Sequence, residues 1–302
     1  MDNDRYIEKK IKLNSNEYIN CDLLKKLIKK GLVDLFPKNI DTFYELFSGS
    51  AIVSMNTKAN KYVLSDTNDK LIEMYQMFKD YDSEHIINHV DSRINEYGLP
   101  RERTKRCDYK GDISNIEKYK ANYFRFRKYY NENKNTLDMY TLMFFAFSQQ
   151  FRFNSKGDFN MPFGNDCFTT NNKEYIRNGC DFFINNVEFY NKSFSNVNID
   201  CITNNDFVYL DPPYLNTTAT YNENEGWTMQ DEETLYKFCE ELNNKGIKFG
   251  ISNVFSNKGI TNDKLIKWCE DNNWNLYTFD KMTYYACGKG NANTKEVYIC
   301  NY

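Results

Sequence analysis

The sequence lacks several features that would place it in large classes of protein. No apolar run approaches the roughly eighteen continuous residues that a membrane-spanning helix needs. The first five residues, which include two aspartates, do not form a secretory signal peptide. No internal repeat and no low-complexity linker interrupts the chain. We therefore expect a cytoplasmic protein that does not enter a membrane.

Metal ligands and disulfides are also poorly represented. The nine cysteines are scattered without a Cys-x-x-Cys pair, which predicts neither a zinc site nor a disulfide framework. The only two histidines, His85 and His89, have the spacing of metal ligands on a helix, but no acid or cysteine cluster supports them. We expect both on a helix surface, and we expect no metal. A Gly-x-Gly-x-x-Gly phosphate cradle is missing too, which disfavours a dinucleotide cofactor.

Positive charge is scarce in the chain as a whole. The formal net charge of −3 is unusual for a protein that binds nucleic acid. The basic residues nevertheless gather in one middle segment, at Arg101, Arg103, Lys105, Arg106, Lys110, Lys118, Lys120, Arg125, Arg127 and Lys128. Such a segregated patch can bind phosphates while the rest of the surface repels them. The alternative is an ordinary solvated helix face.

The most informative pattern present is an apolar run that stops at an acid. Residues 207–210 read as a strand, and Asp211, Pro212, Pro213 and Tyr214 follow. Two prolines cannot donate backbone hydrogen bonds, so we expect a stiff loop at the carboxyl end of this strand, where open α/β sheets bind ligands. A carboxylate and a ring held together can bind a flat heterocycle with an amino group. The alternative is a plain turn after a buried strand.

A second pattern lies far upstream. Residues 41–47 read as a strand that enters a small-residue turn at Gly49, residues 52–58 as a helix, and residues 61–66 as a strand that ends at Asp66. This is the geometry of nucleotide-type binding: the backbone approaches the ligand at the turn, and the acid accepts hydrogen bonds from two ribose hydroxyls. A ligand with a ribose but no phosphate fits best, and S-adenosylmethionine is such a ligand.

Together these patterns resemble the Dam-like, α-class DNA adenine N6-methyltransferases, which include phage and bacterial enzymes. The resemblance runs from about residue 18 to residue 302, in blocks that keep the family's order. The blocks are residues 45–50, 64–66, 72–75, 152–164, 211–214, 246–254 and 295–299. The resemblance implies an α/β, Rossmann-like class I S-adenosylmethionine-dependent methyltransferase fold with an inserted helical and β-hairpin target-recognition domain.

The resemblance also implies cofactor residues. Phe47, Ser48 and Gly49 would line the methionine end of S-adenosylmethionine, and Asp66 would hold its ribose. Phe194 would lie beside the adenine of the cofactor, and its alternative is a core aromatic. The full set of cofactor residues is Tyr18, Phe47, Ser48, Gly49, Ser50, Asp66, Phe194 and Asp211.

Two positions depart from the family's pattern. The family begins with an aromatic residue closely followed by a glycine and a lysine that reaches the cofactor region. The counterpart here, residues 18–24, has Tyr18 but neither the glycine nor the lysine. Ser50 replaces the second glycine of the cofactor turn. These departures imply a differently built amino-terminal wall of the cofactor site, or weaker cofactor binding.

The same resemblance implies that the substrate is an adenine flipped out of double-stranded DNA. The catalytic residues would be Asp211, Pro212, Pro213 and Tyr214, and the DNA-binding residues Phe147, Arg152, Asn154, Pro162 and Tyr221. Among these, Arg152 would read a base, Pro162 would pack on a thymine methyl group, and Tyr221 would help to cover the target base. Phe147 would fill the space that the adenine leaves, or it is a core residue.

The expected organisation follows from these assignments. We predict a catalytic domain from residues 1–80 and 180–302 and a target-recognition domain from residues 81–179, with a hairpin near residues 151–164. A two-stranded ribbon fits the major groove of DNA, where arginine pairs with guanine. Further helices are predicted at residues 21–30, 69–79, 232–243 and 263–272, and further strands at residues 247–251, 275–280 and 296–301.

The resemblance implies methyl transfer to the N6 amine of a flipped adenine, with GATC as the candidate target, in the cytoplasm of a bacterial or phage-infected cell. A second hypothesis is methylation of another exocyclic amine, namely cytosine N4 in DNA, an RNA base or a protein glutamine. A third is a DNA-binding homologue without catalytic activity. The sequence leaves open a role in restriction-modification, in a phage or as a housekeeping mark, and it leaves open the oligomeric state.

Overall fold

The computed structural model describes residues 31–103, 113–164, 166–215, 227–257, 259–278 and 295–302. The chain forms two compact units: Met1–Asp69 with Asn186–Tyr302, which we call the sheet unit, and Lys70–Asn185, which we call the helical unit. The limits of the catalytic and target-recognition domains, predicted near residues 80 and 180, stay a prediction. In the described ranges, none of the helices combines the length and the apolar character needed to cross a bilayer.

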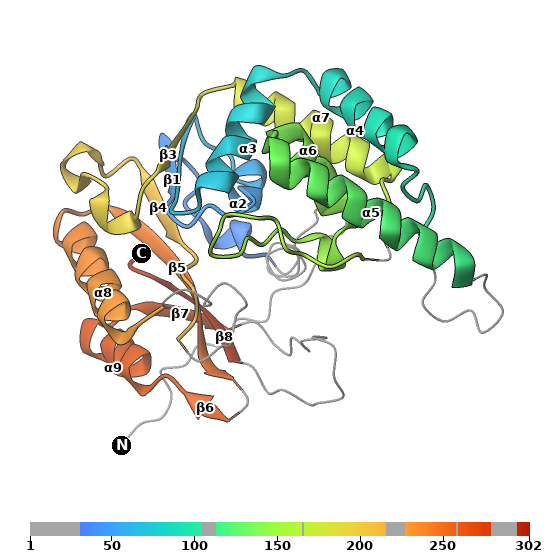
Figure 1. The fold of residues 1–302 in the computed structure, drawn as a ribbon. Coiled ribbons are helices and arrows are strands. Elements are labelled where there is room, and N and C mark those ends of the chain that lie inside the picture. The colour runs from blue at the N-terminus through green and yellow to red at the C-terminus, as the bar shows by residue number, and fades with distance from the viewer. Residues whose placement is uncertain (1–30, 104–112, 165, 216–226, 258, 279–294) are drawn as a thin grey trace. The chain divides into compact units, whose positions relative to one another are not determined.

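The sheet unit is built on one eight-stranded sheet with the order β3-β2-β1-β4-β5-β8-β7, and β6 pairs with β5 (Figure 1). Strands β1 to β5 are parallel, whereas β8 runs antiparallel to both of its neighbours. The strands are β1 (Thr42–Glu45), β2 (Lys61–Asp66), β3 (Val187–Asn191), β4 (Phe207–Leu210), β5 (Lys248–Asn257), β6 (Ile260–Thr261), β7 (Asn275–Thr278) and β8 (Lys295–Cys300). The predicted α/β, Rossmann-like architecture is confirmed.

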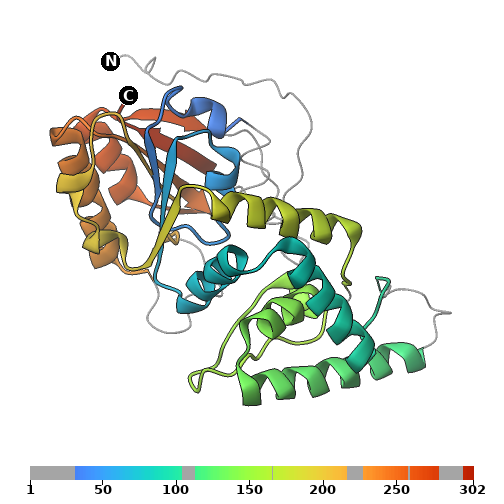
Figure 2. The same ribbon diagram turned by 90° about the horizontal axis from the view of Figure 1, so that it is seen from above.

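Helices cover both faces of this sheet, as Figures 1 and 2 show. The helices of the sheet unit are η1 (Val33–Leu35), α2 (Ile52–Asn56), η3 (Phe194–Asn196), η4 (Ile199–Cys201), α8 (Met229–Asn244) and α9 (Asp263–Asn272). Two separate apolar cores result, one with α8 and α9 and the other with η1 and α2. All four residues of β4 are buried because its two faces contribute to both cores, which explains its unbroken apolar sequence.

The local sequence patterns predicted most of these elements. Strand β2 and helix α9 have the predicted bounds. Strand β5 is longer than predicted and continues to Asn257, because β8 and β6 pair with its distal half. The helix predicted at residues 21–30 lies outside the described residues.

The helical unit contains six of the described helices. They are α3 (Asp69–Asp80, whose first residue belongs to the sheet unit), α4 (Ser83–Tyr97), α5 (Ile113–Asn133), α6 (Thr136–Phe145), η2 (Phe147–Gln149) and α7 (Thr170–Ile184). Helix α4 packs against α5, α6 and α7. Gly179 on α7 admits the ring of Phe78, since a Cβ at this position would lie 3.0 Å from a ring carbon. Phe78 in turn stacks on Phe183 with a centroid separation of 5.7 Å.

Between η2 and α7 the chain folds back on itself in the segment predicted as a hairpin. Phe153 and Phe159 form an antiparallel bridge, and Asn154 closes the turn between them. The Asn154 side-chain oxygen accepts hydrogen bonds from the backbone N–H groups of Lys156 and Asp158, both at 2.9 Å. Gly157 adopts the left-handed conformation that such a turn requires, with a φ of +74°. We call residues 151–164 the hairpin segment.

A buried carboxylate joins two helices of this unit. Asp138 on α6 accepts hydrogen bonds from His89 Nε2 at 2.7 Å and from Arg93 Nε at 2.7 Å, both on α4. The prediction for His89 is therefore wrong: it is half-buried and bonded, because its partner lies 49 residues away where spacing cannot reveal it. His85 is exposed and stacks on Tyr81, as a surface position allows.

We predict that Asp138→Asn lowers the free energy of unfolding by about 2–3 kcal/mol, because it leaves the Arg93 charge without its buried partner. Burial favours a raised pKa for Asp138, but the hydrogen bonds from His89 and Arg93 outweigh it and hold this pKa below its usual range. The contribution should therefore be present above a pH of about 4 and be lost as the pH falls further.

Urea unfolding of both proteins between pH 3 and pH 7 would measure this effect. The control is Glu132→Gln, which removes an exposed ion pair with Lys128 at 3.9 Å and should cost less than about 1 kcal/mol. Equal stability of Asp138→Asn and the wild type at pH 7 would contradict the assignment.

Candidate active site

Three acidic side chains follow neighbouring parallel strands at the same edge of the sheet. Glu45 is the last residue of β1, Asp66 is the last residue of β2, and Asp211 directly follows β4. Strand β1 lies between the other two, and Glu45 pairs with Leu64 and with Tyr209. Asp66 and Asp211 therefore both lie two residues beyond the level of Glu45. Carboxyl edges of parallel sheets are the usual place for ligands.

Asp66 fixes the turn that follows β1. Its Oδ2 accepts a hydrogen bond from the backbone N–H of Gly49 at 2.9 Å, and its Oδ1 accepts one from Asn68 at 2.9 Å. Burial raises the pKa of Asp66, and these backbone donors oppose the rise. A carboxylate has about four acceptor positions, more than its backbone donors occupy here, so Asp66 keeps capacity to accept from a ribose hydroxyl. A Cβ at Gly49 would meet none of the described atoms within 4 Å, so this side of the turn offers room for a ligand.

The rest of the turn packs on an aromatic cluster. Ser48 is buried and bonds through its backbone N–H to the carbonyl of Ser65 at 3.1 Å, whereas Ser50 is exposed. The Phe47 ring lies 5.1 Å from that of Phe194 and 5.6 Å from that of Trp227. Phe194 is buried, as its core alternative requires, while Phe47 and Trp227 are half-buried. Phe47 and Trp227 are therefore the rings of this cluster best able to face a ligand.

Two of these residues were missed by sequence reasoning. Trp227 lies just before α8 and belongs to none of the motifs recognised in the sequence. Its Nε1 donates a hydrogen bond to the buried Glu232 at 2.5 Å. Glu45 is the first residue of the block at residues 45–50, and the sequence pattern did not predict a role for it. An acid at the end of a predicted strand was the signal that could have found it. Its Oε2 accepts hydrogen bonds from the backbone N–H of Ser54 at 2.9 Å and from the Ser54 hydroxyl. Burial raises the pKa of Glu45 to about 8, and the charges of Asp211 and Asp66 add to the rise.

The double-proline loop brings Asp211 and Tyr214 together. The Tyr214 hydroxyl donates a hydrogen bond to Asp211 Oδ1 at 2.9 Å. Pro212 is buried, and Pro213 and Tyr214 are half-buried. Burial raises the pKa of Asp211 to about 7, although the Tyr214 hydrogen bond works against the rise. A carboxylate that titrates near neutrality beside a fixed ring is typical of a catalytic site.

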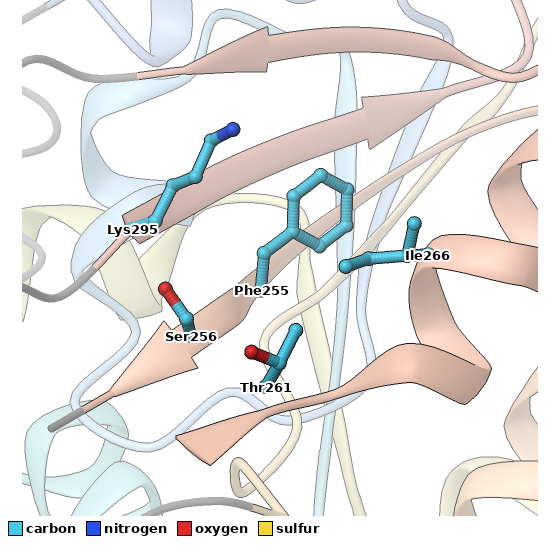
Figure 3. Close-up of a pocket in the computed structure, with 5 residues that line it drawn as sticks. All are labelled: Phe255, Ser256, Thr261, Ile266 and Lys295. Atoms are coloured by element: carbon cyan, nitrogen blue, oxygen red, sulfur yellow. The ribbon is translucent and has the colours of Figure 1, made fainter. Parts of the chain in front are cut away.

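A cavity of about 210 Å³ lies at the same edge beyond β5, lined by Phe255, Ser256, Thr261, Ile266 and Lys295 (Figure 3). Figure 3 shows the Phe255 ring between the Lys295 and Ile266 side chains, with the Ser256 and Thr261 side chains below it in this view. None of the predicted site residues that the structure describes lines this cavity. In the described part of the chain, no group of three or more histidine, cysteine, aspartate or glutamate residues could hold a metal ion.

The predicted DNA-binding residues lie in the helical unit, apart from Tyr221. Phe147 is half-buried, and its backbone N–H donates to the carbonyl of the exposed Pro162 at 2.9 Å. Arg152 Nε donates to Asn160 Oδ1 across the hairpin segment at 2.9 Å. Tyr18 and Tyr221 lie outside the described residues.

The basic middle segment is extensively paired. Six of its side chains contact acids or backbone carbonyls: Arg101 with Asp91, Arg103 with Asp166, Lys120 with Glu117, Lys128 with Glu132, Arg125 with Tyr97 O and Arg127 with Met161 O. Lys105, Arg106 and Lys110 lie outside the described residues. This pairing favours the solvated helix face over a continuous phosphate-binding patch.

We predict that Tyr214→Phe raises the pKa of Asp211 above its value of about 7, because the hydroxyl that stabilises the charged carboxylate is lost. The measurement is a pH titration of the aspartate carboxyl carbons by NMR. Tyr190→Phe is the matched control, since its hydroxyl donates to Glu188 instead. An Asp211 titration that does not move in Tyr214→Phe would show that the hydrogen bond does not tune this carboxylate.

Comparison with known proteins identifies the family. Residues 24–283 match the family model described as D12 class N6 adenine-specific DNA methyltransferase. The chain is 37% identical over 307 residues to the type II methyltransferase M.FokI of Planomicrobium okeanokoites, covering 96% of this chain and 44% of that protein. It is 35% identical over 284 residues to the modification methylase StsI of Streptococcus sanguinis, covering 90% of this chain and 40% of that protein.

A DNA adenine methylase of Vibrio cholerae is 26% identical over 247 residues, which cover 74% of this chain and 78% of that protein. The chain thus spans less than half the length of M.FokI and StsI but most of the length of the Vibrio protein. The resemblance to the Dam-like methyltransferases is confirmed, and with it the class I fold. The chain belongs to the D12 class of N6 adenine-specific DNA methyltransferases.

Proposed function

We propose that this protein transfers a methyl group from S-adenosylmethionine to the exocyclic N6 amine of an adenine in double-stranded DNA. The observation that carries the proposal is the contact between Asp211 and Tyr214 on a double-proline loop, beside the Asp66 carboxylate that holds the Gly49 turn. Family membership supports the same reaction. Activity, substrate and partners are inferred for this chain, which spans only part of its longer relatives.

The acid cluster suits a cationic ligand. Burial raises the pKa values of Glu45, Asp66 and Asp211, and at Glu45 repulsion by the charges of the other two acids adds to the rise. A cation near them would relieve this repulsion, whereas the pyrophosphate of a dinucleotide would add to it. When bound, S-adenosylmethionine supplies a methyl group on a positively charged sulfur. This match favours it over a phosphorylated cofactor.

Several residues would bind this cofactor. Asp66 would accept hydrogen bonds from the ribose hydroxyls with the lone pairs that its backbone donors leave. Phe47 would line the methionine end of the cofactor and Phe194 would lie beside its adenine. The Trp227 ring packs on both, with centroid separations of 5.6 Å and 6.0 Å. Ser48, Gly49, Ser50 and Tyr18 stay predicted cofactor residues.

Asp211 and Tyr214 would prepare the nitrogen for attack. Asp211 and the carbonyl of Pro212 would accept hydrogen bonds from the adenine amine, which draws the nitrogen lone pair out of conjugation with the ring. Tyr214 would stack on the flipped base and Pro213 would stiffen the loop. The nitrogen–carbon bond forms as the carbon–sulfur bond breaks, and the nitrogen then gives up one proton, for which Asp211 is an acceptor. The rate gain comes from orientation and electrostatics.

The hairpin segment would select the target. Arg152, Asn154 and Pro162 would contact base edges. Phe147 would fill the space that the flipped adenine leaves in the duplex. Tyr221 would help to cover the flipped adenine. We leave the target sequence unassigned, with GATC as the first candidate to test. The place of the reaction, the cytoplasm of a bacterial or phage-infected cell, stays a prediction.

The experiment that tests this function is incubation with unmethylated duplex DNA and methyl-labelled S-adenosylmethionine, followed by nucleoside analysis. Label in N6-methyladenine supports the proposal, and label in N4-methylcytosine supports the nearest alternative. Cofactor binding without labelled DNA would direct the search to RNA bases and protein amides. A protein that binds duplex DNA but no cofactor would be a homologue without catalytic activity.

We predict that Asp211→Ala lowers the methylation rate by about 10³-fold or more, because the amine loses the acceptor that orients it. Cofactor binding should weaken by less than about tenfold, since Asp66 and the aromatic cluster are unchanged. Transfer of labelled methyl groups and calorimetric cofactor binding measure the two effects. Full activity in this variant would remove Asp211 from the mechanism.

We predict different outcomes for two substitutions of Tyr214. Tyr214→Ala should lose about 10- to 100-fold in kcat/KM, because stacking of a base on a ring contributes about 1–3 kcal/mol. Tyr214→Phe keeps the ring, so at pH 9 it should retain most of its activity. Its kcat/KM should fall more steeply than that of the wild type as the pH drops towards 7, because Asp211 becomes protonated earlier. Equal losses in both variants at pH 9 would mean that the hydroxyl and not the ring acts on the substrate.

A further inference from the structure

The backbone of the hairpin segment has one edge that none of the described strands pairs. Two hydrogen bonds flank the Phe153–Phe159 bridge: Asn154 N donates to Asp158 O and Asn160 N donates to Arg152 O, both at 2.9 Å. This is the pattern of a non-hydrogen-bonded antiparallel pair, in which the backbone groups of the paired residues point away from the partner strand. The N–H and C=O of Phe159 therefore face outwards, although Phe159 is buried.

Asn131 on α5 satisfies both of these backbone groups. Its Oδ1 accepts a hydrogen bond from Phe159 N at 2.8 Å, and its Nδ2 donates to Phe159 O at 3.2 Å. One side-chain amide thus takes the place of a neighbouring strand. A buried backbone N–H without a partner is costly, so this position depends on an amide.

The same edge is held at two further points. The carbonyl of Met161 accepts hydrogen bonds from the Tyr123 hydroxyl at 3.0 Å and from Arg127 Nη1 at 2.9 Å, and the carbonyl of Gly157 accepts one from Lys134 Nζ at 2.6 Å. We call Tyr123, Arg127, Asn131 and Lys134 the α5 rail, because they lie on α5 and on the residue after it and bond to the returning limb.

The spacing of the α5 rail matches the spacing of the strand. Arg127 and Asn131 are four residues apart, which corresponds to about 6 Å along a helix. Their partners Met161 and Phe159 are two residues apart, which corresponds to about 6.6 Å along a strand. The near equality of these two steps lets successive turns of one helix bond to successive outward carbonyls of the limb.

The α5 rail also connects to the predicted base-reading arginine. Asn160 follows Phe159 directly, donates its backbone N–H to Arg152 O, and accepts a hydrogen bond from Arg152 Nε at 2.9 Å. A shift of the backbone at Phe159 would therefore move the Arg152 guanidinium. We propose that Asn131 is a positioning residue that sets target-sequence selection, by fixing the hairpin segment through Phe159; this role rests on the proposed function.

The test compares Asn131→Leu with Asn133→Leu in the full chain. Asn133 is an exposed residue of the same helix whose side chain bonds only within α5, to Tyr129 O at 2.8 Å. The wild-type target is first mapped by sequencing methylated DNA. Discrimination is then the ratio of kcat/KM on a duplex with that site to kcat/KM on duplexes with one base pair changed.

We expect Asn131→Leu to reduce this discrimination about tenfold, because two hydrogen bonds to the limb are lost. The loss should fall mainly on KM for DNA, and the dissociation constant of S-adenosylmethionine should not change. Asn133→Leu should match the wild type. Asn131→Asp keeps the acceptor for Phe159 N–H and should be intermediate, which also covers the case in which the leucine variant does not fold.

Hydrogen exchange of the Phe159 amide supplies a readout that needs no DNA. It should accelerate about tenfold in Asn131→Leu and not in Asn133→Leu. Unchanged discrimination in Asn131→Leu, or equal losses in both leucine variants, would overturn the proposal. A wild-type protein that methylates no duplex would overturn the proposed function instead, and unchanged Phe159 exchange would show separately that Asn131 does not hold the limb.

Discussion

Parallel pairing of β1 with both β2 and β4 is the constraint on which the candidate site depends. The pairing sets Glu45 level with Leu64 and Tyr209, so Asp66 at the end of β2 and Asp211 directly after β4 both lie two residues beyond it. The central strand leaves the sheet early because the chain turns at Ser48 and Gly49. Two acids that extend beyond a third on the strand between them follow from the strand register alone.

The three acids Glu45, Asp66 and Asp211 are tolerated at a cost in stability. Backbone donors hold Asp66, and Ser54 donates two hydrogen bonds to Glu45, but burial still raises the pKa values of both, and of Asp211. A raised pKa means that the folded protein binds protons more tightly than the unfolded chain. The contribution of these acids to stability therefore falls as the pH rises from about 4 through 7 and 8. A bound cation would oppose this fall in stability with rising pH. The three acids therefore lower the stability of the free protein and favour the binding of a cationic ligand.

The sequence was sufficient for those parts of the site that depend on short stretches of chain. Asp66, Gly49 and Asp211 lie at or just after the ends of strands that can be recognised from short apolar runs and the turn residues that follow them. The structure brings Asp66 and Gly49 into direct contact. Contacts between distant side chains were not accessible in this way. His89 and Asp138 are 49 residues apart, and Asn131 and Phe159 are 28 apart, so no periodicity relates them. Trp227 was missed for the same reason, since its neighbours Phe47 and Phe194 come from other strand ends.

The α5 rail also bears on the negative net charge of the chain. A two-stranded hairpin is marginally stable by itself, and the hairpin segment has a single bridge between its limbs, so a helix supplies the rigidity that its own ladder lacks. Arg127, which counted as a phosphate contact in the sequence, is used for this purpose: it bonds Met161 O and lies 4.6 Å from the Phe124 ring centroid. In a protein that acts on DNA as proposed, a basic side chain that bonds a carbonyl of the protein's own backbone contributes less to the general attraction for DNA phosphates. Selection then depends on side chains held in fixed positions, because phosphate contacts position a protein while base contacts specify the sequence.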